Sequence, residues 1–381
     1  MIELTEEQQM IRDTVRDFAA QEIAPIAAEI DENMTFPENT VKQMSELGLL
    51  GIPFPEEYGG AGLDTLSYTI VVEELAKVCA SHALTVAAHT SLGTYPIALF
   101  GNEAQKQKYL PKLASGEWLA CFGLTEPAVG SDVGNLKCTA EKVDGGFKLN
   151  GSKAFITNAG YAEVIIAFAV SGRNEDGKNL ITSFILEKEM AGIAVGEKEK
   201  KMGWRASDTR QIHFDDVFVP EEQVLGTVGE GFTQAMIILD GGRISIAAMS
   251  LGIARGALEA ALGYAKERKQ FGKPVSDFQA IQLKIADMAT SVNAAELLTY
   301  HASLLKDAGK DFRMAAYMAK LYASETATRV ANDAIQIHGG YGFVKEYPVE
   351  RFYRDAKGCE IGEGTSEVQR ILISKLLMKQ Q

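Results

Sequence analysis

The spacing of apolar residues changes twice along this 381-residue chain. From Glu3 to about Ser115 apolar side chains recur every three or four positions, which is the period of an amphipathic helix. Between about Cys121 and Gly226 they alternate with polar residues in short runs bounded by Gly, Asn, Asp or Pro, as in half-buried strands. The helical period then returns in three long segments, Thr233 to Glu267, Asp277 to Asp307 and Phe312 to Ile337.

This order predicts an α+β multidomain chain made of helices, then a sheet, then a helix bundle. Because 381 residues exceed the size at which a single hydrophobic core stops growing, we expect three domains. They are an all-α domain over 1–120, an antiparallel β domain over 121–228 and an α-helical bundle over 229–381. Junctions between such domains are common places for ligand pockets.

The composition narrows the class of function. The net charge of −13 argues against a nucleic-acid partner, because phosphate binding needs clustered Lys and Arg. We find no membrane-spanning apolar run and no signal-peptide start, so we expect a cytoplasmic protein without a membrane span. The four cysteines form no CxxC pair and the five histidines no HExxH pattern, which predicts reduced thiols and no metal site.

One carboxylate near the C-terminus lies between two glycines, in the stretch "IGEGTSEVQR". Gly362 and Gly364 give the backbone around Glu363 unusual freedom and let a ligand approach closely. Thr365 or Ser366 can cap the helix that follows. Glu363 is therefore either a positioned base or a solvated loop residue.

Two segments of the β region could hold a flat heteroaromatic ring. In "FGLTEPAVGSD", residues 122–132, exposed backbone groups and two hydroxyls could form hydrogen bonds to such a ring, although a plain turn is the alternative. In "KAFITNAG", residues 153–160, Phe155 and Thr157 project from one face of a strand and Ile156 from the other. An ordinary half-buried strand would have the same pattern.

Three further segments could bind phosphate groups. Arg268 in "ERKQFGKP" could bind a pyrophosphate, but helix C-termini attract basic residues in any case. The glycines of "QIHGGYGF" would let backbone N–H groups approach a ligand, and helix termination alone explains Gly339; the GxGxxG spacing is missing. Arg243 in the apolar stretch "LDGGRISIAAMSLG" needs either an acid of the protein or a ligand phosphate as partner.

Taken together, "GLTEPAVGSD", "QIHGGYGF" and "EGTSEVQR" resemble hallmarks of the flavin-dependent acyl-CoA dehydrogenase family, and the likeness covers essentially the whole chain. It is nearest to the short-chain, butyryl-CoA type. The resemblance implies a middle β-barrel, a C-terminal four-helix bundle and a homotetramer with one FAD per subunit. It also implies an acyl-CoA substrate and electron-transferring flavoprotein as electron acceptor.

The resemblance assigns three groups of contact residues. FAD contacts are implied for Phe122, Leu124, Thr125, Ser131, Phe155, Ile156, Thr157, Thr365 and Glu367. Arg268 and Gln279 match residues that reach the FAD of a neighbouring subunit, and Gln336, Gly339 and Gly340 match a second adenine and pyrophosphate contact. Substrate contacts are implied for Ser131, for the CoA-binding stretch with Asp240 and Arg243, and for Gly364.

The resemblance makes Glu363 the catalytic base, which takes the α-proton of the acyl-CoA while the β-hydrogen leaves as hydride to the flavin. Two hydrogen bonds to the thioester carbonyl, from the Glu363 N–H and an FAD hydroxyl, would stabilise the enolate as in an oxyanion hole. Burial beside an acyl chain should raise the pKa of Glu363.

Two positions decide how far the resemblance reaches. Gly362 replaces a tyrosine that short- and medium-chain members commonly carry, and we hypothesise that it widens the pocket for a branched or cyclic acyl group. Gly242 lies at the helix site from which the isovaleryl type supplies its base, so the base cannot come from there. An acyl-CoA oxidase, a nitroalkane-oxidase-like or monooxygenase relative and a non-catalytic binding protein are the alternatives.

Overall fold

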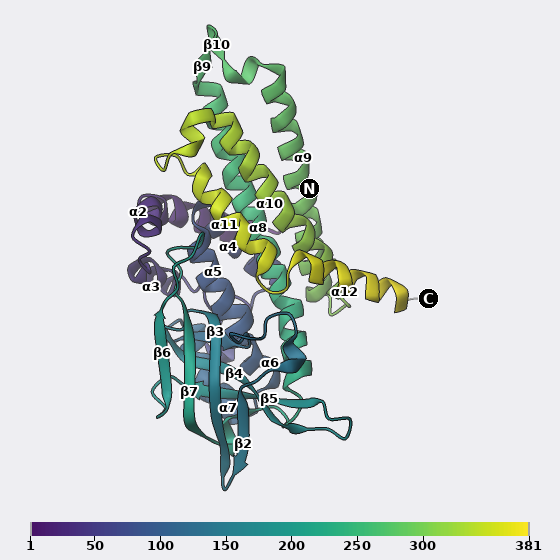
Figure 1. The fold of residues 1–381 in the computed structure, drawn as a ribbon. Coiled ribbons are helices and arrows are strands. Elements are labelled where there is room, and N and C mark those ends of the chain that lie inside the picture. The colour runs from purple at the N-terminus through teal and green to yellow at the C-terminus, as the bar shows by residue number, and fades with distance from the viewer. Residues whose placement is uncertain (1, 380–381) are drawn as a thin grey trace.

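The computed structural model describes residues 2–379, and residues 1 and 380–381 of the first and third expected domains lie outside this range (Figure 1). The N-terminal region is helical, as predicted. Its helices are α1 (Glu6–Phe18), α2 (Ala27–Glu32), α3 (Glu38–Glu46), α4 (Thr65–Val78), α5 (Ala80–Ala87), α6 (Tyr95–Phe100) and α7 (Glu103–Ala114), with the π-helical segments η1 (Ala19–Ile23) and η3 (Ala88–Thr94). Thr5 and Gln8 form a capping box that starts α1.

The middle region forms one eight-stranded sheet with the order β6-β7-β3-β2-β4-β5-β8, and β1 lies beside β4. Its strands are β1 (Leu119–Gly123), β2 (Thr139–Val143), β3 (Gly146–Thr157), β4 (Ala162–Arg173), β5 (Asn179–Glu187), β6 (Ile193–Lys198), β7 (Thr209–Pro220) and β8 (Val224–Leu225). Within residues 2–379 the pairing path begins at β6 and ends at β8, so the β-barrel is open between these two strands.

The expectation of a purely antiparallel sheet is wrong for one strand. β1 pairs with β4 in parallel, and β2 also meets β4 in parallel at a single residue pair. Parallel strands need a long connection, and the hairpin β2–β3 lies between β1 and β4 in the chain and supplies it.

Strand β4 shows why both faces of the sheet are covered. Alternate side chains of a strand point to opposite faces. Ile165 and Ala167 lie in a core inside the curved sheet together with Phe147, whereas Val164 and Ile166 pack on the other side, in the core that contains residues of α7 and α8.

The C-terminal region contains α8 (Gly231–Glu267), α9 (Gln279–Asp307), α10 (Arg313–His338), α11 (Val349–Ile361) and α12 (Ser366–Lys379). A hairpin of β9 (Lys269–Gln270) and β10 (Lys273–Pro274) follows α8 and lies at the end of the molecule opposite to the sheet (Figure 1). The three predicted long helices begin and end within two residues of α8, α9 and α10.

Helix α8 forms the spine of the molecule and packs against both α4 and α10. Buried residues of α1, α4, α8, α10 and α11 belong to one continuous core, so the first and third regions pack as a unit. By length and composition α8 could cross a membrane, a feature that we did not expect, but 78% of its most apolar window is buried inside the protein.

Candidate active site

Glu363 lies in a short loop with unusual backbone geometry. Helix α11 ends at Ile361 and α12 begins at Ser366. Between them Glu363 has a φ of 54° and Gly364 a φ of 95°. A positive φ is uncommon for a residue with a side chain and persists only where the surroundings hold it. The Thr365 hydroxyl accepts a hydrogen bond from the Val368 N–H at 3.3 Å, so Thr365 caps α12.

The carboxylate of Glu363 is shielded although the residue as a whole is half-buried. Its Oε2 is inaccessible to solvent and has no hydrogen-bond partner among the described residues. It lies against Gly242, at the point where a β-carbon of residue 242 would be, and Leu92 borders the same point. Burial raises the pKa of Glu363 to about 7, although the charges of Arg243 and Lys320 lower it.

Two side chains that the sequence did not suggest bind the backbone of this loop. The ammonium group of Lys320, on α10, donates to the carbonyl oxygen of Gly364 at 2.6 Å. The amide nitrogen of Gln369, on α12, donates to the same oxygen at 2.9 Å and to that of Glu363 at 3.4 Å. Both side chains are fully buried. A lone lysine among the apolar positions of "AAYMAKLYAS" could have indicated such a contact.

Arg243 has its partner within the protein. It forms an ion pair with Asp240 one turn earlier on α8 and lies over the Tyr317 ring, 4.7 Å from the centroid. The Tyr317 hydroxyl donates to Asp240 at 2.8 Å. Of the two partners left open by the sequence, an acid of the protein is therefore the one present.

The predicted ring-binding segments of the sheet lie side by side, because the Ala154 N–H donates to the Thr125 carbonyl at 2.9 Å. Phe155 has a φ of 58° at a break in the β3–β7 register, and its ring is 67% exposed. Thr157 is half-buried. The Ile156 side chain is buried in the sheet core, so the predicted contact of Ile156 with FAD would involve its backbone.

The remaining predicted residues of the β region differ in exposure. Phe122 is half-buried, Leu124 is buried and Ser131 is exposed in the loop after the turn at Glu126. Lys153, next to Ala154 in the chain, is completely buried. It donates to Glu126 at 2.8 Å and to the Leu124 carbonyl at 3.2 Å.

Segment η3 packs between strand β1 and the loop of Glu363. Leu92 borders the contact between Glu363 and Gly242, and the next residue, Gly93, packs against Ala120 of β1 so closely that a β-carbon would not fit. A cavity of about 240 Å³ is lined by Ser91 and Gly241, which directly precede Leu92 and Gly242 in the chain, and by Tyr68, Ile238 and Ile244.

Trp204 borders the loop on another side. Its ring packs directly on Gly358 of α11 and lies 3.7 Å from the position of a β-carbon on Gly362. The Trp204 backbone has a φ of 51°, and its N–H donates to buried Asp355. The Trp204 ring therefore fills part of the space beside Gly362.

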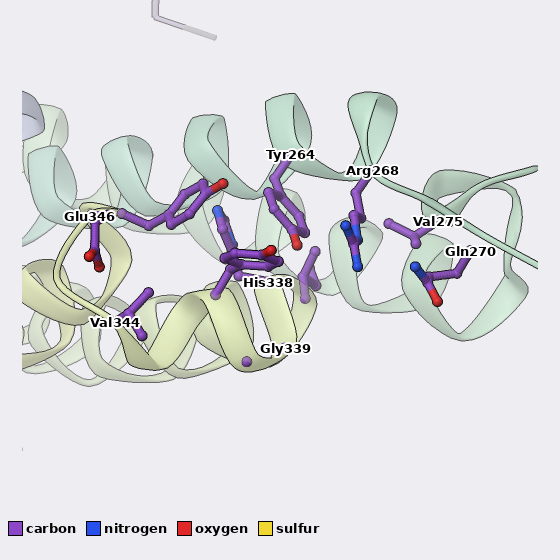
Figure 2. Close-up of a pocket in the computed structure, with 12 residues that line it drawn as sticks. Tyr264, Arg268, Gln270, Val275, His338, Gly339, Val344 and Glu346 are labelled. Carbon is purple, nitrogen blue, oxygen red and sulfur yellow. The ribbon is translucent and has the colours of Figure 1, made fainter.

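A second cavity, of about 750 Å³, lies at the far end of α8 (Figure 2). Arg268 lines it together with Gly339 and Gly340, and a stack of Tyr264 and His338, 4.2 Å between centroids, forms one wall. Gln279 and Gln336 are exposed and do not line this cavity.

The predicted residues thus form two separate groups. Gly242, which contacts Glu363, lies on α8, and Arg268, which lines the second cavity, directly follows the end of that helix. At 1.5 Å per residue the two are about 39 Å apart. Within residues 2–379 no group of three or more His, Cys, Asp or Glu side chains could hold a metal ion.

Three family models match this chain over most of its length. They describe the N-terminal, middle and C-terminal domains of acyl-CoA dehydrogenases, at residues 5–117, 121–217 and 229–378. A probable acyl-CoA dehydrogenase of Bacillus subtilis, YngJ, is 53% identical over 377 residues, and the match covers 99% of both chains.

Solved structures give the same result. Butyryl-CoA dehydrogenase from Megasphaera elsdenii superimposes with a TM-score of 0.97 at 45% identity, over 99% of this chain and 100% of that one. A chain from work on the electron transferring flavoprotein of Acidaminococcus fermentans and flavin-based electron bifurcation gives a TM-score of 0.96 at 48% identity, over 99% of both chains.

The helices around a sheet and the buried acid beside α8 define a flavin-dependent dehydrogenase. The chain belongs to the acyl-CoA dehydrogenase family, whose members are FAD-dependent oxidoreductases.

Proposed function

We propose that this protein dehydrogenates a short-chain acyl-CoA at its α and β carbons, with Glu363 as the base. One observation carries the proposal: Glu363 Oε2 is shielded, has no hydrogen-bond partner within residues 2–379 and faces a glycine. A carboxylate whose pKa is raised by burial to about 7 is well matched to proton abstraction near neutral pH.

The loop around Glu363 can supply two groups to one substrate. The side chain takes the α-proton. The backbone N–H of Glu363 forms no backbone hydrogen bond in the described part of the chain, so it is free to donate to the thioester carbonyl. Such a preorganised donor stabilises the charge that develops on the carbonyl oxygen.

FAD, when bound, supplies the acceptor for the β-hydride. Phe122, Thr125, Phe155 and Thr157 would hold its ring, since an exposed aromatic ring on a strained backbone beside open backbone groups suits a flat heterocycle. Gly339 and Gly340 leave open space where side chains would otherwise lie, and Arg268 stands beside them in the second cavity. A bidentate guanidinium and exposed backbone suit a pyrophosphate.

The 240 Å³ cavity is our candidate for the acyl pocket, because its lining residues Ser91 and Gly241 are the chain neighbours of Leu92 and Gly242, which border the Glu363 carboxylate. The size favours a short chain such as the butyryl group of the Megasphaera relative. A branched or cyclic acyl group, which we inferred from Gly362, is the second candidate. The Trp204 ring beside Gly362 weighs against it.

We also propose a homo-oligomer, and from the family a homotetramer. The separation of about 39 Å along α8 exceeds the length of one FAD molecule, so Arg268 can reach an FAD near Glu363 only in another subunit. Exposed apolar side chains near the second cavity support this: Phe271 is 92% and Phe343 88% exposed. Helix α12 extends from the body and carries exposed Ile371 and Met378 (Figure 1).

For the electron acceptor we propose an electron-transferring flavoprotein in the cytoplasm, supported by the similarity to the chain from the Acidaminococcus work. Anaerobic titration of the purified protein with butyryl-, isobutyryl-, isovaleryl- and cyclohexanecarboxyl-CoA, monitored at the flavin band, tests the substrate. Butyryl-CoA should bleach the band fastest. Rapid peroxide formation in air would instead identify an oxidase, and full activity of Glu363→Gln would refute the base.

A further inference from the structure

Lys320 is a buried cation whose side chain reaches the active-site loop from a different helix. Lys320 is fully buried on α10, and its ammonium group donates to the carbonyl of Gly364, the residue that follows Glu363. Burial of an ammonium group is costly unless it is paired. Burial lowers the pKa of Lys320 to about 8, and the charge of Glu363 is one of the groups that raise it.

The carbonyl group that Lys320 binds belongs to a segment with unfavourable backbone geometry. Glu363 and Gly364 both have positive φ, and such a conformation is strained for a residue with a side chain such as Glu363. Lys320 and Gln369 both donate to the Gly364 oxygen, at 2.6 Å and 2.9 Å. These two bonds fix the loop in the conformation that directs the carboxylate toward Gly242.

We propose that Lys320 is a positioning residue for the dehydrogenation, with Gln369 as its neutral counterpart. The proposal rests on the assignment of Glu363 as base. Lys320 holds the Glu363–Gly364 backbone, and with it the direction of both the carboxylate and the Glu363 N–H. Its positive charge also favours the ionised carboxylate, the form able to accept a proton.

Three charged or titratable groups face Glu363 from the helices around it: Arg243 from α8, Lys320 from α10 and Tyr68 from α4. Arg243 is already paired with Asp240. Lys320 has no carboxylate partner within 4.0 Å among the described residues. Its hydrogen bond goes to the backbone carbonyl of Gly364. Arg243 and Lys320 both lower the pKa of Glu363, so removal of Lys320 should raise it.

The test uses the flavin-loaded enzyme with Lys320→Met, Lys320→Arg and Gln369→Met. In Lys320→Met, kcat should fall on the order of 10²-fold because the base is misplaced. The midpoint of the pH profile of kcat/KM should rise by about one pH unit because a cation is lost. Lys320→Arg should restore the midpoint. Gln369→Met should lower kcat and leave the midpoint in place.

A second readout does not depend on turnover. Acetoacetyl-CoA is a 3-ketoacyl thioester that ionises to an enolate, and Lys320→Met should bind it about tenfold more weakly, because the N–H donor is misdirected. Lys77→Met is the matched control: it removes a partly buried cation that pairs with Glu259 at a part of α8 about 26 Å from Gly242.

The outcomes separate this proposal from the function on which it rests. Wild-type kcat, pH midpoint and acetoacetyl-CoA affinity in Lys320→Met would overturn the role of Lys320 and leave Glu363 untouched. If Glu363→Gln stays active, the base assignment fails first. If Lys320→Met does not fold, Lys320→Gln replaces it, because this variant keeps a hydrogen-bond donor and loses the charge: a pH midpoint raised above that of Lys320→Arg supports the proposal, and equal midpoints in the two variants overturn it.

Discussion

The Oε2 atom of Glu363 occupies the place that the β-carbon of residue 242 would take if Gly242 were any other amino acid. A loop after α11 and the middle of α8 therefore share one small volume beside Leu92. Any side chain at position 242 would therefore compete with the Glu363 carboxylate for this volume. In this chain the glycine leaves the volume to Glu363.

Gly242→Ala should separate activity from stability. The added methyl group meets the end of a flexible side chain rather than backbone, so the free energy of unfolding should change by less than about 1 kcal/mol. The carboxylate, however, is displaced, and a shift of about 1 Å can cost on the order of 10²-fold in rate. Single-turnover flavin bleaching with butyryl-CoA measures this, with Gly263→Ala as control, since nothing lies within 4 Å of a β-carbon there. An unimpaired Gly242→Ala would show that Glu363 works from another position.

The raised pKa of Glu363 predicts opposite effects of pH on activity and stability. Activity needs the ionised form, so kcat/KM should fall tenfold per pH unit below about 7. Stability behaves in the other direction. The pKa in the folded protein lies above that of an exposed glutamate, so the contribution of Glu363 is fully present at low pH and is lost as the pH rises through 7.

Glu363→Gln should therefore be inactive and yet, at pH 8, more stable than the wild type by up to about 3 kcal/mol. At pH 4 the two proteins should unfold alike. Guanidinium unfolding at both pH values checks this. A difference that is equal at pH 4 and pH 8 would mean that the carboxylate is not buried in solution.

Much of the fold could be predicted because helical periodicity is a strong local signal, and α8, α9 and α10 begin and end within two residues of the predicted segments. Strand pairing is not local, so the parallel contact of β1 with β4 was missed. The site shows the same division. Glu363 could be recognised from its glycines, whereas the contact of Lys320 with Gly364 joins residues 44 positions apart and that of Trp204 with Asp355 joins residues 151 apart.

The ion pair of Lys153 and Glu126 should stabilise the two segments around Thr125 and Phe155 that we propose hold the flavin ring. Both side chains are buried, and Glu126 also accepts from the Lys137 and Cys138 N–H groups. Lys153→Met leaves a buried carboxylate without its cation and should lower the free energy of unfolding by about 3–5 kcal/mol. Glu126→Gln in the same background should recover part of the loss. Chemical denaturation of the FAD-free protein measures both, and a Lys153→Met protein of wild-type stability would contradict the prediction.

Trp204 should limit the width of the space beside Gly362. Its ring stands 3.7 Å from the position of a β-carbon on Gly362. In Trp204→Leu we expect kcat/KM for isovaleryl- and cyclohexanecarboxyl-CoA to rise relative to butyryl-CoA, on the order of tenfold, since pocket contacts of a methylene or two change binding by about 1–3 kcal/mol. Trp118→Leu, a change of the other tryptophan, is the control. An unchanged ratio would place the acyl group elsewhere.

Arg268 should act on the FAD of another subunit, and mixed oligomers can decide this. Glu363→Gln removes the proposed base and Arg268→Ala the proposed pyrophosphate contact, so each variant alone should be strongly impaired. When both are co-expressed with different affinity tags and purified as mixed oligomers, some sites combine Glu363 of one chain with Arg268 of the other. Because the two residues lie about 39 Å apart along α8, these sites should be intact, and roughly a quarter to a half of wild-type activity should return in the mixed species. Mixing of Glu363→Gln with Lys320→Met, two changes in the same loop region, provides the control, because no mixed site regains both the base and its support. Failure of the Arg268 pair to complement in verified mixed oligomers would show that each chain binds its own FAD from end to end.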